Sequence, residues 1–309
     1  MEKIIEQILP YFPPEIKEDI IWIFKKYPNC EEIRVRVNKP LSFFAQGREG
    51  ATNFLVDKGI IEKIFYLLTN YSYYSVEEEL QKGYITIPGG HRVGICGKAV
   101  VEKEKVKTLV DINSLNIRIA RQKKGIGDKV LPYIIKDNIF LSTIILSPPN
   151  CGKTTLLRDL VRILSSSDKF SFKVGVVDER SEIAGCFRGI PQLDIGKRVD
   201  VIDSCPKKEG MIMLIRSMSP HILATDELGK KEDIDALEYA ITAGVNVLTT
   251  VHGKDLFDLK NKGNFREILS LNLFKRLIIL SNKGGMGTIE DIIDLETGRS
   301  IWEGKYYVV

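Results

Sequence analysis

A lysine and two threonines follow a short loop in the stretch ILSPPNCGKTTLLRDLVRIL, which runs from Ile145 to Leu164. The order G-x-x-x-x-G-K-[ST] is typical of loops that bind nucleotide phosphates, and only its first glycine is replaced here, by Ser147. The preceding NIFLSTIILS predicts a strand, and the leucines after the loop have helical spacing. The loop therefore lies between a strand and a helix N-terminus, the context that phosphate binding requires.

The amide donors of this loop are expected after its two prolines, because Pro148 and Pro149 have no N–H. Asn150 tolerates a positive φ and Gly152 allows close backbone approach, while the helix dipole favours an anion at this end. Ser147 ends the strand ahead of these donors, so its replacement of glycine is expected to alter the turn without removing a donor. The alternative is a chance turn before a helix.

Two adjacent acids supply the rest of a hydrolytic site. HILATDELG predicts an apolar strand that ends in Asp226 and Glu227. We expect Lys153 to reach the β- and γ-phosphates and Thr154 to ligate Mg²⁺. Asp226 would hold the metal through water and Glu227 would orient or deprotonate the attacking water, unless the two acids only cap a helix. The residues expected to contact the nucleotide are Ser147, Pro148, Pro149, Asn150, Cys151, Gly152, Lys153, Thr154 and Thr155.

An extra strand, SFKVGVVDER, lies between the phosphate loop and the acidic pair. This order favours a water-activating ATPase over a GTPase or a nucleotide kinase, and therefore ATP with Mg²⁺. Three further segments, VVDERSE, MLIRSMSP and VLTTVHG, are expected at the same crevice, since open α/β sheets bind ligands at the carboxyl ends of strands. His252 is either a γ-phosphate sensor or a structural histidine, and Arg216 is either a catalytic residue or a salt-bridge partner. The residues expected to line the site are Asp178, Glu179, Arg180, Arg216, Thr250 and His252, with Glu179, Arg216, Glu227 and His252 as catalytic candidates.

The elements that position these residues fall into two predicted domains. Residues 1–122 predict a smaller α+β domain, in which EEIRVRV puts Ile33, Val35 and Val37 on one strand face. Helical stretches follow around 60–82, the second opening with Ser75 and Glu78 at capping-box spacing. The region after them alternates repeatedly and predicts an antiparallel meander.

From residue 123 to 309 strands and helices alternate, which predicts an α/β domain with a mostly parallel sheet between helices. The boundary is placed near RQKKGIGDK. Residues 180–207 have too few apolar residues in period to form a core element, and long loops are often functional. We expect this segment at a subunit boundary or facing the centre of a ring of subunits, with Arg188 or Arg198 reaching a neighbour. A solvated loop is the alternative. The apolar runs are 139–146, 172–177, 221–225, 245–251 and 275–281.

The composition is that of an ordinary globular protein, with 44% hydrophobic and 28% charged residues. A net charge of +4 without a local basic cluster argues against a specific nucleic-acid partner. The five scattered cysteines form no C-x-x-C pair, so neither a disulfide framework nor structural zinc is expected. The first residues lack the apolar core of a signal peptide, and no window has 18 uncharged apolar residues. We therefore expect a cytoplasmic protein without a transmembrane segment.

Six blocks of the sequence resemble the stage III sporulation protein AA family of endospore-forming bacteria, over nearly the whole chain. They are YITIPGGHRVGICG, SLNIRIAR, SPPNCGKTTLLRDLVR, VGVVDERSEIAG, MLIRSMSPHILATDELG and TTVHG. The family in turn is similar to the type II and type IV secretion and pilus ATPases. The resemblance implies a RecA-like P-loop ATPase core after the N-terminal domain, with VVDERSE as aspartate box, HILATDELG as Walker B and TVHG as histidine box.

The resemblance also implies a hexameric ring with ATP between subunits, where arginines of the N-terminal domain complete the site. Arg92, Arg118 and Arg121 are the candidates, and surface arginines of a strand face are the alternative. Two features depart from the relatives. Asn150 stands where most family members are expected to have glycine, and the cysteine-rich metal modules of the motor relatives have no counterpart, so no zinc is expected.

The role implied by the family is ATP-driven work at a trans-envelope channel between mother cell and forespore. Such a protein would bind membrane proteins of that channel peripherally, at the inner face of the membrane on the mother-cell side. Three alternatives stay open. The mild net charge disfavours a RecA-like nucleic-acid motor. The D-E pair disfavours an ATP-dependent assembly switch with little hydrolysis. A small-molecule kinase would need an acceptor pocket, for which the sequence offers no marker.

Overall fold

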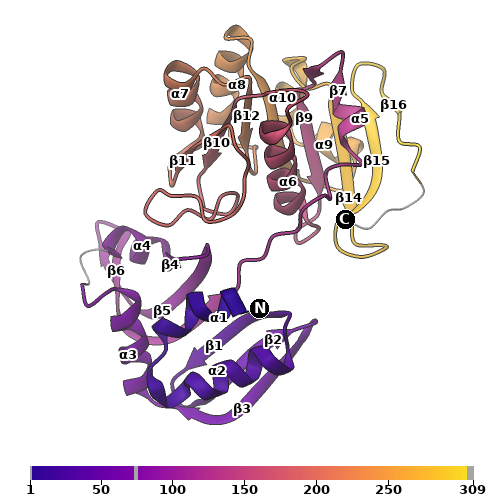
Figure 1. Ribbon diagram of the computed structural model, residues 1–309. Coiled ribbons are helices and arrows are strands. Elements are labelled where there is room, and N and C mark those ends of the chain that lie inside the picture. Colours follow the sequence, from indigo (N-terminus) through magenta and orange to yellow (C-terminus); the bar gives the residue numbers. More distant parts are fainter. Residues whose placement is uncertain (1, 73–75, 305–309) are drawn as a thin grey trace. The chain divides into compact units, whose positions relative to one another are not determined.

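The chain folds into two units (Figure 1). In the computed structural model, which describes residues 2–72 and 76–304, the first unit is Met1–Arg121 with Gly185–Gln192. The second is Gln122–Ala184 with Leu193–Val309. The short segment Gly185–Gln192 therefore belongs to the first unit although its sequence neighbours belong to the second. Ser75, the first residue of the predicted capping box, lies outside the described residues.

The first unit contains a six-stranded antiparallel sheet in the order β3-β2-β1-β6-β5-β4. Ile33 and Val35 of β1 are fully buried, as the alternation of EEIRVRV predicts. Helix α3 begins after Asp57, whose side chain accepts a hydrogen bond from the N–H of Ile60 at 2.8 Å. Its elements are α1 Glu2–Ile8, η1 Leu9–Tyr11, α2 Pro14–Lys26, β1 Cys30–Arg36, β2 Lys39–Ala45, β3 Arg48–Val56, α3 Lys58–Leu68, α4 Glu77–Lys82, β4 Tyr84–Ile87, β5 His91–Glu102 and β6 Lys105–Arg118.

The second unit is built on an eight-stranded sheet in the order β11-β10-β12-β13-β9-β14-β15-β16. The strands from β11 to β14 in this order are parallel to their neighbours, while β15 and β16 are antiparallel. The strands are β7 Ile135–Lys136, β8 Ile139–Phe140, β9 Thr143–Ser147, β10 Val174–Asp178, β11 Val199–Asp203, β12 Ile222–Thr225, β13 Asn246–His252, β14 Arg276–Ser281, β15 Thr288–Asp294 and β16 Arg299–Ser300, of which β7 and β8 form a separate pair.

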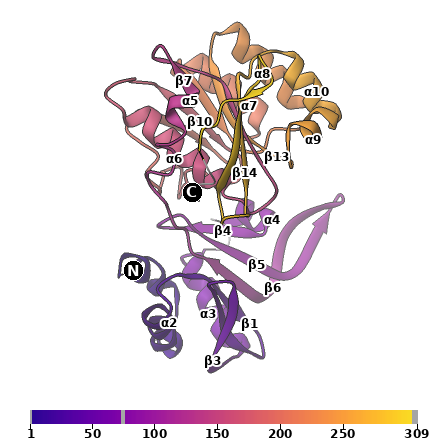
Figure 2. The same cartoon turned by 90° about the vertical axis from the view of Figure 1, so that its right-hand side faces the viewer.

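Helices cover both faces of this sheet, and strands β9, β10 and β12 are consequently buried along their whole length. Helix α6 lies on one face, and α7, α8, α9 and α10 lie on the other (Figures 1 and 2). The apolar residues of α6 at helical spacing, Leu156, Leu157, Leu160, Val161 and Leu164, are all fully buried. The helices are α5 Leu131–Ile134, α6 Lys153–Ser166, α7 Lys207–Met218, α8 Glu232–Thr242, α9 Leu256–Asn261 and α10 Gly263–Ser270.

The parallel strands end at one edge of the sheet, and there they bring polar residues together. The chain leaves β9, forms α6 and returns in β10, with β12 and β13 between these two strands. Such a reversal of strand order opens a crevice at the carboxyl ends of the strands. The last residues of β9, β10, β12 and β13 at this edge are Ser147, Asp178, Thr225 and His252.

The predicted fold class is confirmed, with two local corrections. The apolar run 139–146 is divided, because Ile139 and Phe140 pair with β7 and the central strand β9 begins only at Thr143. Residues 180–207, predicted to lack a core element, contain β11. That strand lies at the sheet edge and is half-buried throughout, so its alternating acids hide it from a search for apolar runs.

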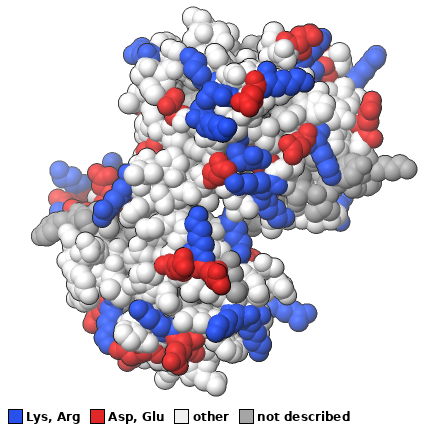
Figure 3. All heavy atoms as spheres, viewed as in Figure 1, with Lys and Arg blue, Asp and Glu red and all other residues white. Residues whose placement is uncertain are grey.

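Lysines and arginines are interspersed with acidic residues on the face of the molecule drawn in Figure 3. This mixing agrees with the small net charge of +4. In residues 2–72 and 76–304, none of the helices combines the length and apolarity needed to cross a membrane.

Candidate functional site

The phosphate loop has a left-handed backbone at two positions before α6 begins. The φ angles are 58° at Asn150 and 83° at Gly152, as expected for residues that tolerate this region. The first amide of α6 with a main-chain acceptor is that of Leu156, which donates to the carbonyl of Gly152 at 3.0 Å. Within the described chain, the amides from Asn150 to Thr155 have no hydrogen-bond acceptor. Free amides at a helix N-terminus suit this loop to the binding of an anion.

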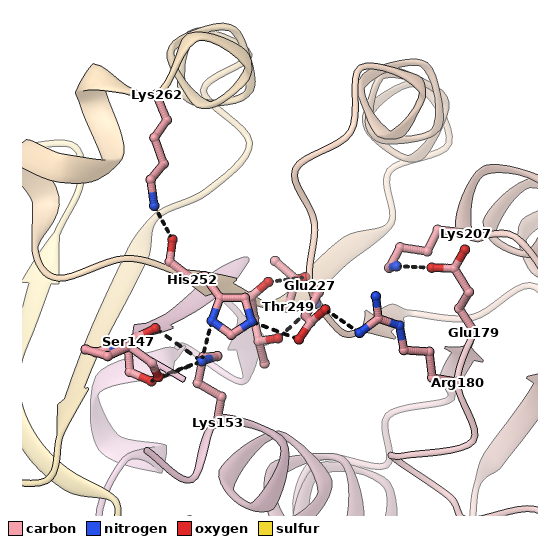
Figure 4. Close-up of polar contacts among 11 residues, drawn as sticks. Ser147, Lys153, Glu179, Arg180, Lys207, Glu227, Thr249, His252 and Lys262 are labelled. Carbon is pink, nitrogen blue, oxygen red and sulfur yellow. Dashed lines mark hydrogen bonds and ion pairs between the residues drawn. The ribbon is translucent and has the colours of Figure 1, made fainter. Parts of the chain in front are cut away.

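The ammonium of Lys153 turns back onto the loop (Figure 4). Its Nζ lies 3.1 Å from the carbonyl of Ser147, 3.2 Å from Ser147 Oγ and 2.9 Å from the carbonyl of Pro148. The fourth neighbour is Nδ1 of His252, at 3.1 Å. Lys153 is 6% exposed, and burial lowers its pKa. A phosphate that binds here has to replace acceptors that the protein itself supplies.

Ser147 therefore does more than shape the turn. Its Oγ donates to the carbonyl of Pro148 at 2.7 Å and accepts from Lys153, while its own carbonyl accepts from the N–H of Gly253 at 3.1 Å. The prediction that this replacement of glycine affects only the turn is incomplete. The hydroxyl adds an acceptor for the lysine of the phosphate loop.

His252 connects this lysine to the acid of the neighbouring strand. Its Nε2 lies 2.9 Å from Glu227 Oε1, and Arg180 Nη1 lies 3.0 Å from Glu227 Oε2 (Figure 4). An ammonium group can only donate, so Nδ1 of His252 must accept from Lys153. The ring proton then resides on Nε2 and is donated to Glu227. The result is a continuous line of lysine, neutral imidazole, carboxylate and arginine.

The backbone of Glu227 has a conformation that is uncommon for a residue other than glycine. Its φ is 45°, and its N–H donates to Thr250 Oγ1 at 2.9 Å. Burial raises the pKa of Glu227, but the hydrogen bond with His252 and the charge of Arg180 outweigh burial and leave the pKa below its ordinary value. The carboxylate is therefore ionised at neutral pH and can orient water or accept its proton.

Asp226 is buried next to this line and is 2% exposed. Burial raises its pKa to about 7, with Lys207 opposing and Asp178 reinforcing the shift. No hydrogen bond from the described residues reaches its carboxylate. A buried carboxylate whose ionisation is costly and which accepts no hydrogen bond fits a divalent cation, which would supply further positive charge. Thr154, half-buried in the first turn of α6, is the hydroxyl ligand expected from the loop.

Asp178, which ends β10, and Glu179, which follows it, make different contacts. Asp178 is fully buried and accepts hydrogen bonds from the N–H groups of Glu182, Ile183 and Ala184 at 2.8–3.0 Å. Its carboxylate is therefore used to fold the loop after the strand and does not line the nucleotide site. Glu179 pairs with Lys207 (Figure 4) and lies 3.5 Å from Lys230 Nζ.

Arg216 lies apart from the residues at the carboxyl ends of the strands. It lies in the last turn of α7, is exposed, and donates from Nε to the hydroxyl of Tyr239 at 3.1 Å. Helix α7 begins at the carboxyl edge, where Lys207 contacts Glu179, and runs back before β12 starts. Its last turn therefore lies away from that edge. The expectation that Arg216 lines the site is corrected for the single chain.

The arginines considered as fingers all belong to the first unit, and each has a partner there. The partners are the Tyr84 ring 3.5 Å from Arg92 Cζ, Glu32 3.9 Å from Arg118, and the carbonyls of Pro28 and Cys30 at 2.7 and 3.0 Å from Arg121. Of the two arginines in the segment 180–207, Arg198 donates to the carbonyl of Ser167 at 2.5 Å, and Arg188 lies over the ring of Phe187. Their action on a neighbouring subunit stays a prediction.

Sequence reasoning did not single out two lysines at this edge. Lys207 contacts Glu179, and Lys262 donates to the carbonyl of His252 at 2.5 Å (Figure 4). Lys207 is 6% exposed although it opens a helix in a charged stretch, PKKEG. Nothing in the local pattern distinguishes it from a surface lysine, and only the tertiary fold reveals its burial.

Comparison with known proteins gives a match over almost the whole chain. The model of the family described as "Sporulation stage III, protein AA" matches residues 3–301. Stage III sporulation protein AA of Bacillus subtilis (strain 168) is 48% identical over 272 residues, which are 87% of this chain and 88% of that protein. The uncharacterized protein ycf45 of Cyanidium caldarium is 32% identical over 48% of this chain and 43% of its own.

Two solved structures illustrate the similarity of fold. The ATPase DotB of Legionella pneumophila aligns with a TM-score of 0.58 at 18% identity, over 87% of this chain and 76% of its own. The pilus retraction motor PilT, crystallised with bound ADP, aligns with a TM-score of 0.55 at 16% identity, over 88% and 77%. At these identities the likeness shows the fold, which is the secretion-ATPase fold.

Proposed function

Because the chain belongs to the stage III sporulation protein AA family, with the fold of secretion and pilus ATPases, we propose that it is a Mg²⁺-dependent ATPase. The observation that carries the proposal is the line from Lys153 through His252 to Glu227 at the N-terminus of α6. It joins the phosphate-binding lysine to an ionised acid in the crevice where nucleotides bind in open α/β sheets.

The triphosphate binds to the free amides between Asn150 and Thr155, and Lys153 leaves its loop carbonyls for the β- and γ-phosphates. Nδ1 of His252 then loses its donor, and it can donate to the γ-phosphate once the ring has bound a proton. Glu227, held by Arg180 and Thr250, orients the attacking water and takes its proton as ADP and phosphate form. Mg²⁺ would neutralise charge on the phosphates, and Asp226 with Thr154 are the residues that would hold it.

The remaining acids support this arrangement. Asp178 fixes the loop that carries Glu179 and Arg180, so Arg180 is presented to Glu227. Glu179, a catalytic candidate by its position, forms an ion pair with Lys207 and lies near Lys230. It would therefore contribute negative charge to the crevice without reacting itself. A role for Arg216 in catalysis is not part of the proposal.

We propose further that the protein works as a homo-oligomeric, hexameric ring at the inner face of a membrane. It would bind membrane proteins of a trans-envelope channel needed for sporulation and power or organise that channel from the mother-cell side. The family and the fold support this role. The subunit contacts would bring Arg92, Arg118 or Arg121 of one chain to the γ-phosphate bound by another.

Two variants test the ATPase activity. Lys153→Ala should abolish binding of ATP with Mg²⁺, because it removes the ammonium expected to contact the β- and γ-phosphates. Glu227→Gln should still bind ATP while its turnover falls by at least about 100-fold, the usual contribution of a general base. Binding is measured by calorimetry and turnover by phosphate release.

Arg216→Ala is the matched control, since this exposed arginine lies outside the crevice and should leave both quantities unchanged. Hydrolysis at the unmodified rate by the Glu227→Gln protein would contradict the mechanism.

A further inference from the structure

A glycine-rich turn lies against the phosphate loop on the side away from the acids. Residues Asn282–Gly287, with the sequence NKGGMG, connect β14 to β15. Strand β14 is the neighbour of β9 and runs parallel to it, so this turn stands at the same sheet edge as the loop that follows β9. Within the turn, the N–H of Gly285 donates to the carbonyl of Asn282 at 3.2 Å.

The turn touches the phosphate loop at Gly152. A Cβ placed on Gly152 would lie 3.3 Å from Cα of Gly287 and 3.9 Å from Cγ of Met286. Gly287 is buried and has a φ of 85°, which glycine adopts at no steric cost. Two glycines thus allow the two backbones to meet. Met286 remains 58% exposed beside this contact.

The direction of a bound nucleotide follows from the strand order. Glu227 follows β12 and His252 ends β13, and both strands lie on one side of β9. The γ-phosphate must face these two residues to be hydrolysed. The nucleoside end of the same molecule must then point to the other side of β9, over β14 and the turn that follows it.

We propose that Asn282–Gly287 is the nucleoside subsite of this ATPase, with Met286 packing on the face of the purine base. The inference rests on the proposed function, because it takes the triphosphate to bind at Lys153. A thioether side chain is flexible and polarisable and makes favourable contacts with aromatic rings. The exposed methionine is therefore suited to cover a base that arrives from solvent.

The test compares two ligands that share the phosphates and differ in the nucleoside. ATP and inorganic tripolyphosphate, each with Mg²⁺, are titrated calorimetrically into the full-length protein. Met286→Ala should weaken ATP binding about tenfold, the order expected when an apolar side chain loses its buried contact. Tripolyphosphate binding should stay within about twofold of the unmodified protein, since the charged contacts at the loop are retained. Met286→Tyr should restore or tighten ATP binding by stacking on the base.

Met213→Ala is the matched control, because Met213 is 55% exposed on α7 and does not touch the loop. Equal weakening of both ligands by Met286→Ala would overturn the subsite and make the turn a mere support of the loop, and so would no change for either ligand. Binding of neither ligand by the unmodified protein would overturn the phosphate site itself and the subsite with it.

A second measurement needs no substitution. The unmodified protein is irradiated with 8-azido-ATP, and the labelled peptide is identified by mass spectrometry. Label in a peptide containing Asn282–Gly287, suppressed by excess ATP and not by excess adenosine, supports the subsite. Label confined to other peptides would overturn it.

Discussion

The ammonium of Lys153 has three protons to donate and four acceptors within 3.2 Å, two of them on Ser147. A nucleotide therefore competes with the protein for this group. The serine that replaces glycine adds one acceptor to this competition, since a glycine at this position would keep the carbonyl and remove the hydroxyl.

Ser147→Gly and Ser147→Ala should both bind ATP more tightly, by about threefold, because each removes one acceptor worth about 1 kcal/mol or less to Lys153. Both substitutions remove the hydroxyl, but only glycine adds backbone freedom. An effect that both variants share is therefore caused by the loss of the hydroxyl. Calorimetric titration with ATP and Mg²⁺ measures it. Weaker binding by both variants would show that the hydroxyl assists the nucleotide and does not compete with it.

Asp226 predicts a dependence of stability on pH. Its pKa is raised to about 7 in the folded protein, from 3.8, so the folded state favours the protonated carboxyl. The stabilisation from this group is complete below the unfolded pKa and is lost as the pH rises through 7. Ionisation of the buried carboxyl at pH 8 costs the folded state at most about 4 kcal/mol, since each unit of pKa corresponds to about 1.4 kcal/mol.

Asp226→Asn should therefore raise the melting temperature at pH 8 by several degrees and change it little at pH 4. Mg²⁺ should stabilise the unmodified protein at pH 8 and leave the variant unaffected. Thermal unfolding of both proteins, monitored by circular dichroism at both pH values with and without Mg²⁺, measures these differences. A variant less stable than the unmodified protein at pH 8 would show that the carboxylate has a partner other than the metal.

At the scale of elements, α6 holds the loop that follows β10. Arg158 on α6 is buried and donates from Nε to the carbonyl of Ile183 at 2.6 Å and from Nη2 to the carbonyl of Glu182 at 2.5 Å. On the same loop, Asp178 accepts three amides. The helix that begins at the phosphate loop thus also fixes the segment that presents Arg180 to the acid.

Arg158→Ala should destabilise the protein by about 3 kcal/mol, because it removes both hydrogen bonds of the guanidinium, one of them to the buried Ile183, and leaves a cavity beside them. Ser166→Ala, in the last turn of α6, removes one exposed hydrogen bond, from the N–H of Lys197 to Ser166 Oγ at 3.2 Å, and should cost about 1 kcal/mol or less. Urea unfolding gives both values, and hydrogen exchange of residues 179–184 should increase only in the first variant. Similar losses in both would contradict the special role of Arg158.

The sequence predicts a strand well where the strand is a continuous run of apolar residues. Strands β9, β10, β12, β13 and β14 are apolar runs because helices bury both faces of the sheet, and the D-E pair and His252 stand at the ends of such strands. Edge strand β11 escapes prediction, because a strand exposed on one side needs no apolar run. The prediction that Arg216 lines the site is wrong for the single chain, because the residue lies in the last turn of α7, which is the turn farthest from the site. The local sequence does not indicate which end of that helix lies at the site.

Side-chain partners are predicted less well than side-chain positions. The motif places Lys153 at the start of a helix, yet it cannot indicate that the ammonium binds Ser147 and His252. Those contacts depend on the register that sets His252 opposite Ser147 in β13 and β9. Register between distant strands is decided by tertiary packing, and one chain segment does not encode it locally.

At the scale of the whole molecule, the two units contribute different residues to the proposed activity. The second unit holds the nucleotide crevice, and the first holds Arg92, Arg118 and Arg121, each with a partner inside its own unit. An arginine supplied across a subunit boundary is worth about 10³–10⁵ in rate. The proposed ring would therefore couple assembly to turnover, and a lone chain with ATP should hydrolyse slowly.

Assembly should accordingly depend on bound ATP. The Glu227→Gln protein, which binds ATP and cannot cleave it, should shift with ATP and Mg²⁺ from the mass of one chain to that of a hexamer, because binding that favours the assembled state drives assembly by mass action. Light scattering coupled to size exclusion measures the mass. Lys153→Ala is the control, since it should keep its nucleotide-free mass with ATP present. A single-chain mass for Glu227→Gln at saturating ATP would remove the ring and leave its arginines as surface residues of the first unit.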